Sequence, residues 1–390
     1  MFGDTAALKG ESFFYDEFSQ RIYLKFNTPL LMKLLIFGGK GGTGKSSISA
    51  ATAVKLSDLI PKNQNILLIS FDIAHNLSDL FATTIGNDLT QITSNLWVIE
   101  PDPELYAQKV TQRFGMLMRE LISSMPIVRK MPKLEEYIEN TFTTKSMTLS
   151  MKNALFFQRI IDADEINEEM KDADSAIQNF DLLQQMKFDY IVADFPPTGN
   201  MIQLLEVPKN TVQIVLKSTL TMFSELKDFF KKIKTAAKIL NPFSKGVTED
   251  QKNRSKEILE IINNVEKRAE RITTLMRESG SLRLVTIPEK PSYEELKRAH
   301  ELTKPYMELE AVHINRIIHR KYYQCEMCNK LREIQDKYIN AIEKDFSNVR
   351  IWKSHMLLEE PIGLEGLRKL AAEIFGSTID AKTLLEPNSQ

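Results

Sequence analysis

Short, uniformly apolar segments alternate with longer stretches of helical periodicity along this chain. These segments are too short for amphipathic helices and predict buried strands at residues 33–38, 66–72, 96–100, 188–194, 212–217, 282–287 and 310–315. Helical patterns lie between most of them. The alternation predicts an α/β fold, in which helices flank a mostly parallel, twisted sheet and the crossovers are right-handed.

Two intervals between the predicted strands are too long for simple crossovers. Residues 101–187 and 218–281 are rich in helix formers and poor in glycine. In the first, Phe114, Leu117 and Leu121 fall on one helical face, and a similar apolar stripe recurs in the second. We expect these intervals to supply an inserted α-helical subdomain that packs together above the sheet.

These patterns divide the chain into a discontinuous core, an inserted subdomain and two ends. We expect the core to comprise residues 33–103, 183–217 and 282–376, and the subdomain residues 104–182 and 218–281. Residues 1–32 are an N-terminal extension for which a strand, a hairpin and a loose arm all stay open. Residues 377–390 are expected to form a frayed tail.

Composition narrows the classes of function. The 390 residues are 43% apolar and 26% charged, as in a globular protein, and 51 basic residues nearly balance 52 acidic ones. This balance gives no electrostatic footprint for nucleic acid and no polybasic membrane anchor. Two cysteines exclude a disulfide scaffold, and neither a secretory signal nor an apolar run of membrane-spanning length is found. We expect a soluble, cytoplasmic protein that does not span a membrane.

The strongest motif is GKGGTGKS at residues 39–46, which fits G-x-x-x-x-G-K-[ST] between a predicted strand and a predicted helix. Its glycines let backbone N–H groups surround phosphate oxygens at a helix N-terminus. Lys45 is expected to bridge the β- and γ-phosphates of ATP, and the Ser46 hydroxyl to bind Mg²⁺. A chance glycine-rich turn is the alternative. The predicted nucleotide-binding residues here are Gly39, Gly41, Gly42, Thr43, Gly44, Lys45, Ser46 and Ser47.

Two aspartates end predicted strands at the edge of the sheet where ligands bind. Asp194 after FDYIVA has the Walker B arrangement, in which the carboxylate holds Mg²⁺ or its waters. Asp72 can orient the water that attacks the phosphate, or it can cap a helix. Pro197, Thr198 and Gly199 follow Asp194 in a stiff turn with a glycine pivot, which can respond to a γ-phosphate.

The loop and both aspartate segments resemble those of the ArsA/Get family of dimerising P-loop ATPases, which includes arsenite-pump and tail-anchored-protein targeting members. SFDIAHNLSDLF (residues 70–81) is similar to its switch I, and DFPPTGN (residues 194–200) to its switch II. The resemblance implies that Lys40 acts in trans on the phosphoryl group held by a partner subunit, that Asp72 positions the hydrolytic water, and that Asn76 belongs to the nucleotide site. Phe71, Ile73 and Asn200 depart from the family pattern, which leaves the rate and the coupling of the switches open.

Two later segments add to the resemblance. Asn315 ends a predicted strand where the family has an asparagine that contacts adenine, although a plain turn asparagine is the alternative. Cys325 and Cys328 form a lone C-x-x-C, whose two thiolates cannot complete a tetrahedral zinc site unless a two-fold dimer brings four. The targeting branch of the family carries such a pair with zinc. A redox dithiol, a bridging iron–sulfur cluster and two merely small residues stay open.

The resemblance covers about residues 33–375 and contains a single P-loop, so it implies a homodimeric ATPase that hydrolyses ATP to ADP and phosphate. We expect ATP-driven closing to bind and deliver tail-anchored membrane proteins, whose transmembrane helices are the clients, with a membrane receptor as a candidate further partner. The Met- and Phe-bearing insertions are candidate walls of a client groove, or they only hold the subdomain together. An arsenite-efflux ATPase subunit and an iron–sulfur scaffold ATPase are the alternatives.

Overall fold

The computed structural model describes residues 32–72, 76–105, 107–108, 152–153, 187–206, 274–319 and 326–388. In this part of the chain a single eight-stranded sheet has the order β3-β4-β2-β5-β1-β6-β7-β8. The short β3 pairs antiparallel with β4 and the other pairings are parallel. The strands are β1 (Lys33–Gly39), β2 (Ile66–Ser70), β3 (Thr90–Gln91), β4 (Leu96–Ile99), β5 (Tyr190–Asp194), β6 (Gly280–Thr286), β7 (Leu309–Ile317) and β8 (Arg350–His355).

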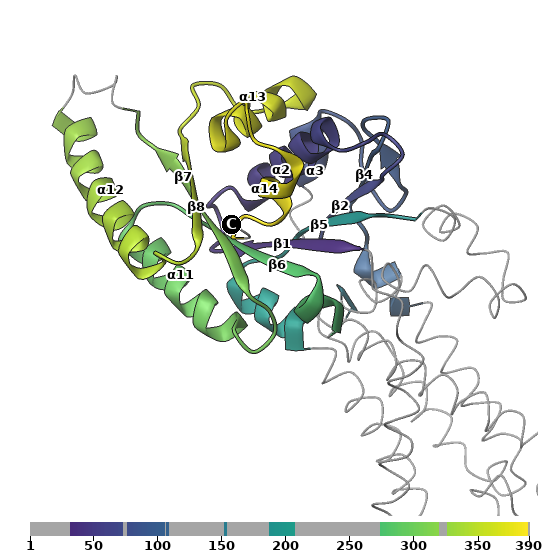
Figure 1. Ribbon diagram of the computed structural model, residues 1–390, viewed down its shortest axis with the longest axis horizontal. Coiled ribbons are helices and arrows are strands. Elements are labelled where there is room, and N and C mark those ends of the chain that lie inside the picture. Colours follow the sequence, from purple (N-terminus) through teal and green to yellow (C-terminus); the bar gives the residue numbers. More distant parts are fainter. Residues whose placement is uncertain are drawn as a thin grey trace, which may run out of the picture. The chain divides into compact units, whose positions relative to one another are not determined.

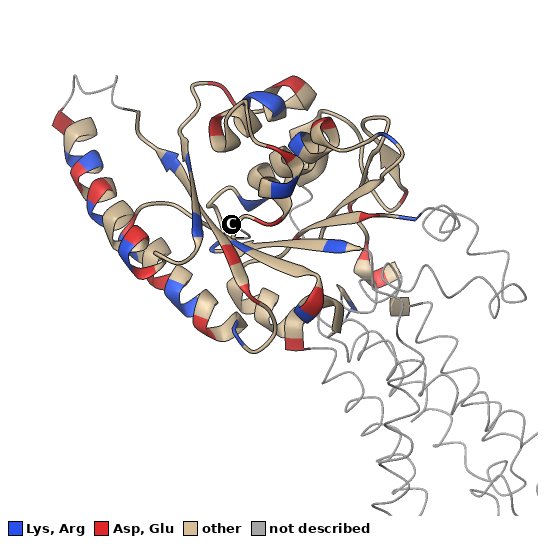
Figure 2. Cartoon of the chain, in the orientation of Figure 1, with Lys and Arg blue, Asp and Glu red and all other residues tan. Residues whose placement is uncertain are grey.

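Helices cover both faces of this sheet (Figure 1). One face carries α2 (Lys45–Leu59), α3 (Asn76–Phe81), α13 (Gly363–Phe375) and α14 (Ala381–Leu385), and the other carries α11 (Lys290–Thr303) and α12 (Glu326–Asp345). The predicted α/β architecture is therefore confirmed. Lys, Arg, Asp and Glu are interspersed along α11 and α12, so neither helix presents a surface of one sign (Figure 2).

The central strands are buried on both faces, which explains their uniformly apolar sequences. Leu34, Leu35, Ile36 and Phe37 of β1 have no exposed surface. Helix α2 packs closely on the sheet because its inner positions include several small, fully buried residues: Ala50, Ala51 and Ala53. The core between α2, α13 and the sheet also holds the phosphate-loop motif in place, because that motif directly joins β1 to α2.

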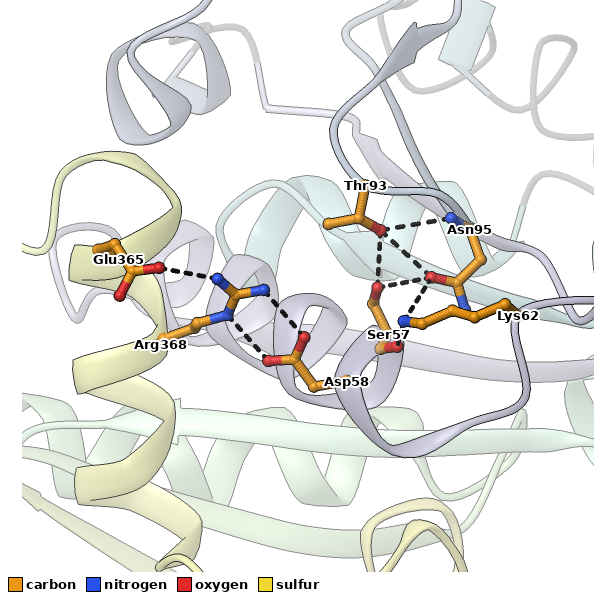
Figure 3. Close-up of polar contacts among 7 residues, drawn as sticks. All are labelled: Ser57, Asp58, Lys62, Thr93, Asn95, Glu365 and Arg368. Carbon is orange, nitrogen blue, oxygen red and sulfur yellow. Dashed lines mark hydrogen bonds and ion pairs between the residues drawn. The ribbon is translucent and has the colours of Figure 1, made fainter.

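The far end of α2 is fixed by two polar clusters (Figure 3). Arg368 of α13 makes a bidentate ion pair with Asp58, with both N–O distances at 3.0 Å. Next to it, the Ser57 hydroxyl donates to the side-chain oxygen of Asn95 at 2.7 Å, and Lys62 donates to the Ser57 carbonyl at 2.6 Å. These contacts tie the end of α2 that lies away from the loop to α13 and to the turn before β4.

Six of the predicted strands are found, with ends that differ by a few residues from the predicted ones. The segment 212–217 and nearly all of the proposed helical subdomain lie outside the described residues, as do residues 1–31, so those predictions stay predictions. The two-residue β3 was not predicted. Strand β8 was also missed. It lies at the edge of the sheet, where exposed and buried side chains alternate along it, so its sequence lacks the apolar run that marked the others.

The prediction of a frayed tail is wrong for most of residues 377–390. Residues 381–385 form α14, and Leu384 is fully buried in the core beside α2. The fully buried guanidinium of Arg283 donates to the main-chain carbonyls of Leu384 and Leu385. Burial lowers the pKa of Arg283 to about 9, against the attraction of the Glu310 carboxylate. A buried cation that needs those carbonyls, together with the Leu384 side chain, orders the segment.

Among the described residues, none of the helices combines the length and the apolar character needed to span a membrane.

We predict that Leu384→Ala lowers the free energy of unfolding by about 2–5 kcal/mol, because it removes a fully buried side chain from the core. Urea unfolding followed by circular dichroism measures the change. The matched control is Lys382→Ala on the exposed side of α14, which should change stability by less than about 0.5 kcal/mol. Equal effects of the two substitutions would show that the segment contributes nothing to the core.

Candidate functional site

The predicted site residues gather where β1, β2, β5 and β7 end. These strands are parallel neighbours or near neighbours in the sheet, so their carboxyl ends lie at one edge. The phosphate loop follows β1, Asp72 lies two residues after the end of β2, Asp194 is the last residue of β5, and Asn315 lies near the end of β7. This edge of an open parallel sheet is the usual place for a ligand.

The phosphate loop is a short turn between Gly39 and the start of α2. Gly44 precedes the helix with φ +89°, in the left-handed region that favours glycine. The Thr43 hydroxyl donates to the Lys40 carbonyl at 2.9 Å and closes the turn. Thr43 and Lys45 are both buried. The first N–H groups of α2 have no partner within the helix, so the loop and the helix end together suit a chain of phosphates.

Asp194 is fully buried at the centre of this edge. Burial raises the pKa of its carboxyl group to about 6, although a hydrogen bond from Ser46 and the charge of Lys45 pull it down. One carboxylate oxygen, Oδ1, is buried and has no hydrogen-bond partner among the described residues. An acceptor in need of a partner beside the Ser46 hydroxyl fits a hydrated Mg²⁺ ion, which takes oxygen ligands.

Ser70 joins the two predicted aspartates, and the sequence analysis missed it. Its hydroxyl donates to Asp194 Oδ2 at 3.3 Å and accepts the Asp72 backbone N–H at 3.2 Å. Strand β2 ends at Ser70, so the half-buried Asp72 lies in the segment that follows the strand. Ser70 is a small polar residue at the end of an otherwise apolar strand, and this feature of the sequence could have identified the link.

The two predicted switches meet through an aromatic pair. The Phe71 and Phe195 rings are 5.4 Å apart in an edge-to-face arrangement, and Phe195 is fully buried. Phe71 departs from the family pattern that the sequence suggested, and here it supplies one half of this contact. A displacement of either segment therefore disturbs the packing of the other.

The start of α3 is held by a residue that the sequence analysis did not select. Glu100, buried after β4, accepts the Leu77 backbone N–H at 2.8 Å and the Ser78 hydroxyl at 3.1 Å. Asn76 is the first residue of α3, while residues 73–75 lie outside the described part. Glu100 ends the predicted strand 96–100, but that position alone does not identify its hydrogen-bond partners, which lie more than twenty residues earlier in the chain.

Switch II lies against the phosphate loop. A Cβ atom placed on Gly41 would be 3.7 Å from Pro197 Cγ. Residues 198–206 are helical, and the Pro197 carbonyl accepts the backbone N–H groups of Asn200 and Met201 at 2.9 and 3.1 Å. The Thr198 side chain is buried, and its hydroxyl has no partner among the described residues, whereas Gly199 is exposed. The segment can thus contact a terminal phosphate that enters the loop.

Lys40 lies at the rim of the loop, paired with Glu289. The two groups are 3.5 Å apart and each side chain is about 40% exposed. The Glu289 carboxylate also accepts a hydrogen bond from Ser292 at 3.1 Å. An exposed ion pair of this kind contributes about 0–1 kcal/mol, so the amine of Lys40 can leave it at little cost.

The remaining predicted residues divide between described and undescribed parts of the chain. Asn315 is buried, and its side-chain amide donates to the Thr43 carbonyl in the phosphate loop at 2.9 Å. Cys325 lies outside the described residues, and Cys328 is half-buried in the first turn of α12. Within the described part, His, Cys, Asp and Glu side chains form no group that could hold a metal ion by themselves. Adenine contact by Asn315 and zinc binding both stay predictions.

A parallel sheet with this loop, helix and buried aspartate defines a P-loop nucleoside triphosphatase. A model of the anion-transporting ATPase family of the ArsA type matches residues 32–376, and the chain belongs to this family of ATPases. The resemblance found in the sequence is therefore confirmed.

Individual relatives are similar along most of their length. The putative arsenical pump-driving ATPase 1 of Aquifex aeolicus is 27% identical over 354 residues, which cover 88% of this chain and 79% of that protein. The ATPase ASNA1 homolog of Dictyostelium discoideum is 27% identical over 386 residues, or 96% of this chain and 99% of that protein. The ATPase GET3 of Komagataella phaffii is 25% identical over 378 residues, with coverages of 92% and 95%.

We predict that Asp194→Asn stabilises the protein in the absence of nucleotide and metal while it abolishes ATP hydrolysis. The raised pKa means that folding disfavours the charged carboxylate, so its cost is absent near pH 4 and complete above about pH 6. The substitution should raise the free energy of unfolding by up to about 3 kcal/mol at pH 8 and by little at pH 4.

Urea unfolding at both pH values measures this difference. Asp79→Asn, at an exposed position on α3, is the control and should change stability by less than about 0.5 kcal/mol at either pH. A destabilising effect of Asp194→Asn at pH 8 would contradict the account of an uncompensated buried charge.

Proposed function

We propose that this ATPase works as a homodimer that uses ATP to bind and deliver tail-anchored membrane proteins. The observation that carries the proposal is Lys40, a second lysine at the rim of the phosphate loop whose partner in the described part of the chain is Glu289, in an exposed ion pair. Two relatives support it: the ATPase GET3 of K. phaffii and the ATPase ASNA1 homolog of D. discoideum match this chain over nearly its full length. We place the protein in the cytoplasm, with a membrane receptor as a further partner.

The chain's own residues divide the work of hydrolysis. Backbone N–H groups of the loop and Lys45 hold the phosphates. Ser46 and Asp194 would hold Mg²⁺, and the bound ion would supply positive charge near the phosphoryl oxygens. Asp72 is half-buried next to this centre and orients the attacking water. Pro197, Thr198 and Gly199 respond to the γ-phosphate, and the Phe71–Phe195 contact relays this response to switch I.

Lys40 acts in the partner subunit's site. On leaving Glu289, its amine can reach across a two-fold interface and stabilise charge on the transferred phosphoryl group, as an arginine finger does. Because two such lysines exchange across one interface, ATP favours the closed dimer over the open one. Only this difference in affinity can drive the clients' binding and release.

The clients bind to the helical insertions at residues 104–182 and 218–281. Their sequences carry Met and Phe at helical spacing, which suits an adaptable apolar groove for a transmembrane helix. Cys325 and Cys328 would supply two thiolates per chain to a zinc ion shared by the dimer, and four thiolates suit structural zinc.

An arsenite-efflux role is the second candidate, because the A. aeolicus relative is named a putative arsenical pump-driving ATPase. The chain has only two cysteines to offer to a metalloid, and this favours the targeting role. An iron–sulfur scaffold is the third candidate and depends on the same two cysteines.

We predict that Lys40→Ala lowers ATP turnover by about 10³-fold or more, and Asp72→Asn by about 10²-fold or more, while the Kd for ATP changes by less than about fivefold. Glu289→Gln is the control for Lys40, and turnover should stay within about fivefold because the exposed pair is weak.

Mixing two inactive chains separates action in trans from action in cis. Lys40→Ala and Lys45→Ala protein together should recover roughly a quarter of the wild-type rate, because a mixed dimer has one site with both lysines. If Lys40 serves its own subunit's nucleotide, no mixed dimer contains a complete site and the mixture stays inactive. That result would overturn the shared-site mechanism.

We predict that the Asp72→Asn protein, loaded with Mg²⁺ and ATP, captures a co-expressed protein that has one C-terminal transmembrane segment. Affinity purification followed by immunoblotting measures the capture. A matched client with three apolar residues of that segment replaced by Asp should be lost, because the groove binds apolar surface. Capture without nucleotide dependence would contradict the ATP-driven clamp.

Two further measurements on the purified protein discriminate the alternatives. A colourless protein with about one zinc per two chains supports the structural zinc site, whereas a brown protein supports the iron–sulfur scaffold. Stimulation of hydrolysis by arsenite together with no client capture would support efflux and reject targeting.

A further inference from the structure

The Asn315 side chain has a defined orientation within a buried hydrogen-bond network. Its oxygen accepts the Arg316 backbone N–H at 2.9 Å and the Ser354 hydroxyl at 2.8 Å, and its nitrogen donates to the Thr43 carbonyl at 2.9 Å. A backbone N–H can only donate and a carbonyl can only accept, so the two ends of the amide cannot be exchanged. Asn315 is 7% exposed and Ser354 is 2% exposed, so water competes little for these bonds.

The backbone around Asn315 departs from regular strand geometry to form this network. Arg316 has φ +57°, a left-handed conformation that is uncommon for a residue other than glycine. The pairing of β7 with β8 also shifts register between Ile314 and Ile317. Strain of this kind costs about 1–3 kcal/mol and persists only where the surroundings impose it. Here the Arg316 N–H points at the side chain of the preceding residue, Asn315.

The phosphate loop is shaped to accept the asparagine. A Cβ atom on Gly44 would lie 2.5 Å from Asn315 Nδ2, so the absence of a side chain at Gly44 is needed for this contact as well as for its backbone conformation. The contact is made at the peptide that joins Thr43 to Gly44, immediately before the first residue of α2.

We propose that Asn315 is a positioning residue for the phosphate loop, which acts by fixing the direction of the Thr43–Gly44 peptide. In a trans peptide the carbonyl and the N–H point in opposite directions. Because Asn315 holds the Thr43 carbonyl, the Gly44 N–H must point away from Asn315. The side chain thus orients a phosphate-binding donor, and this effect does not require the base.

The register shift at β7 gives the network a second anchor on the edge strand. Ser354 belongs to β8, and its hydroxyl holds the oxygen end of the amide. The orientation of the loop is therefore fixed from β7 and β8. These strands lie on the other side of β1 and β6 from β2 and β5, which lead to Asp72 and Asp194.

The test compares Mg²⁺–ATP with Mg²⁺–tripolyphosphate, which has the phosphates but no base, as competitors of a fluorescent ATP analogue. Asn315→Ala and Asn315→Asp should each weaken both ligands by about 10-fold or more. Loss of affinity for ATP with tripolyphosphate unchanged would show that Asn315 acts only through the base and would overturn the proposal. So would unchanged affinity for both ligands.

Two further variants keep the test independent of folding. Ser354→Ala leaves Asn315 in place but removes one bond that orients it, and it should weaken both ligands by an equal, smaller factor of about threefold. Asn95→Ala removes another buried amide, at the far end of α2, and should lower stability without a change in either affinity (Figure 3). If Asn95→Ala reproduced the effect of Asn315→Ala, general destabilisation would explain both and the positioning role would be rejected.

Discussion

The parallel pairing of β5 with both β1 and β2 is the constraint on which the candidate site depends. Asp194 stands opposite Phe37 of β1 on one side and Ser70 of β2 on the other. In this register the end of β1, which leads into the phosphate loop, lies on one side of the Asp194 carboxylate. The end of β2, which leads into switch I, lies on the other side. A shift of one residue would turn the Asp194 side chain to the other face of the sheet and separate it from Ser46.

The same arrangement lowers the stability of the folded chain, because it buries the charge of Asp194. A carboxylate with no exposed surface is stabilised only in part by Ser46, Ser70 and Lys45, and the nearby charge of Asp72 works against it. Folded proteins keep such groups where function requires them. The oxygen of Asp194 that lacks a partner in the described residues and the buried hydroxyl of Thr198 lie in segments that a nucleotide and its cation would bring together. The site thus contains buried polar groups that a bound nucleotide and its cation could pair with.

Much of the described sheet could be predicted from the sequence, and the residues predicted for the phosphate site lie together at one edge of it. The apolar strands are buried on both faces, so their composition alone marks them, and the loop motif fixes the positions of Lys45 and Ser46. What the sequence could not reveal depends on long-range partners. Glu100 looks like an ordinary strand-end residue until α3 is placed beside it.

The edge strand and the last helix of the core were also not predictable from local sequence. The edge strand β8 alternates exposed and buried positions over only six residues, which is too short a pattern to stand out. Residues 381–385 are ordered by the burial of Leu384 and by Arg283, a residue about a hundred positions earlier. Local sequence carries no information on such a partner.

The attachment of α2 at both of its ends has a mechanical consequence. Arg368 and the Ser57–Asn95 cluster fix one end, and the Thr43–Asn315 bond lies just before the other. A helix restrained in this way resists tilting and sliding, so we expect the phosphate loop to keep its position when a phosphate is lost. The conformational change that follows hydrolysis would then occur in α3 and in residues 198–206, which begin at the same edge of the sheet.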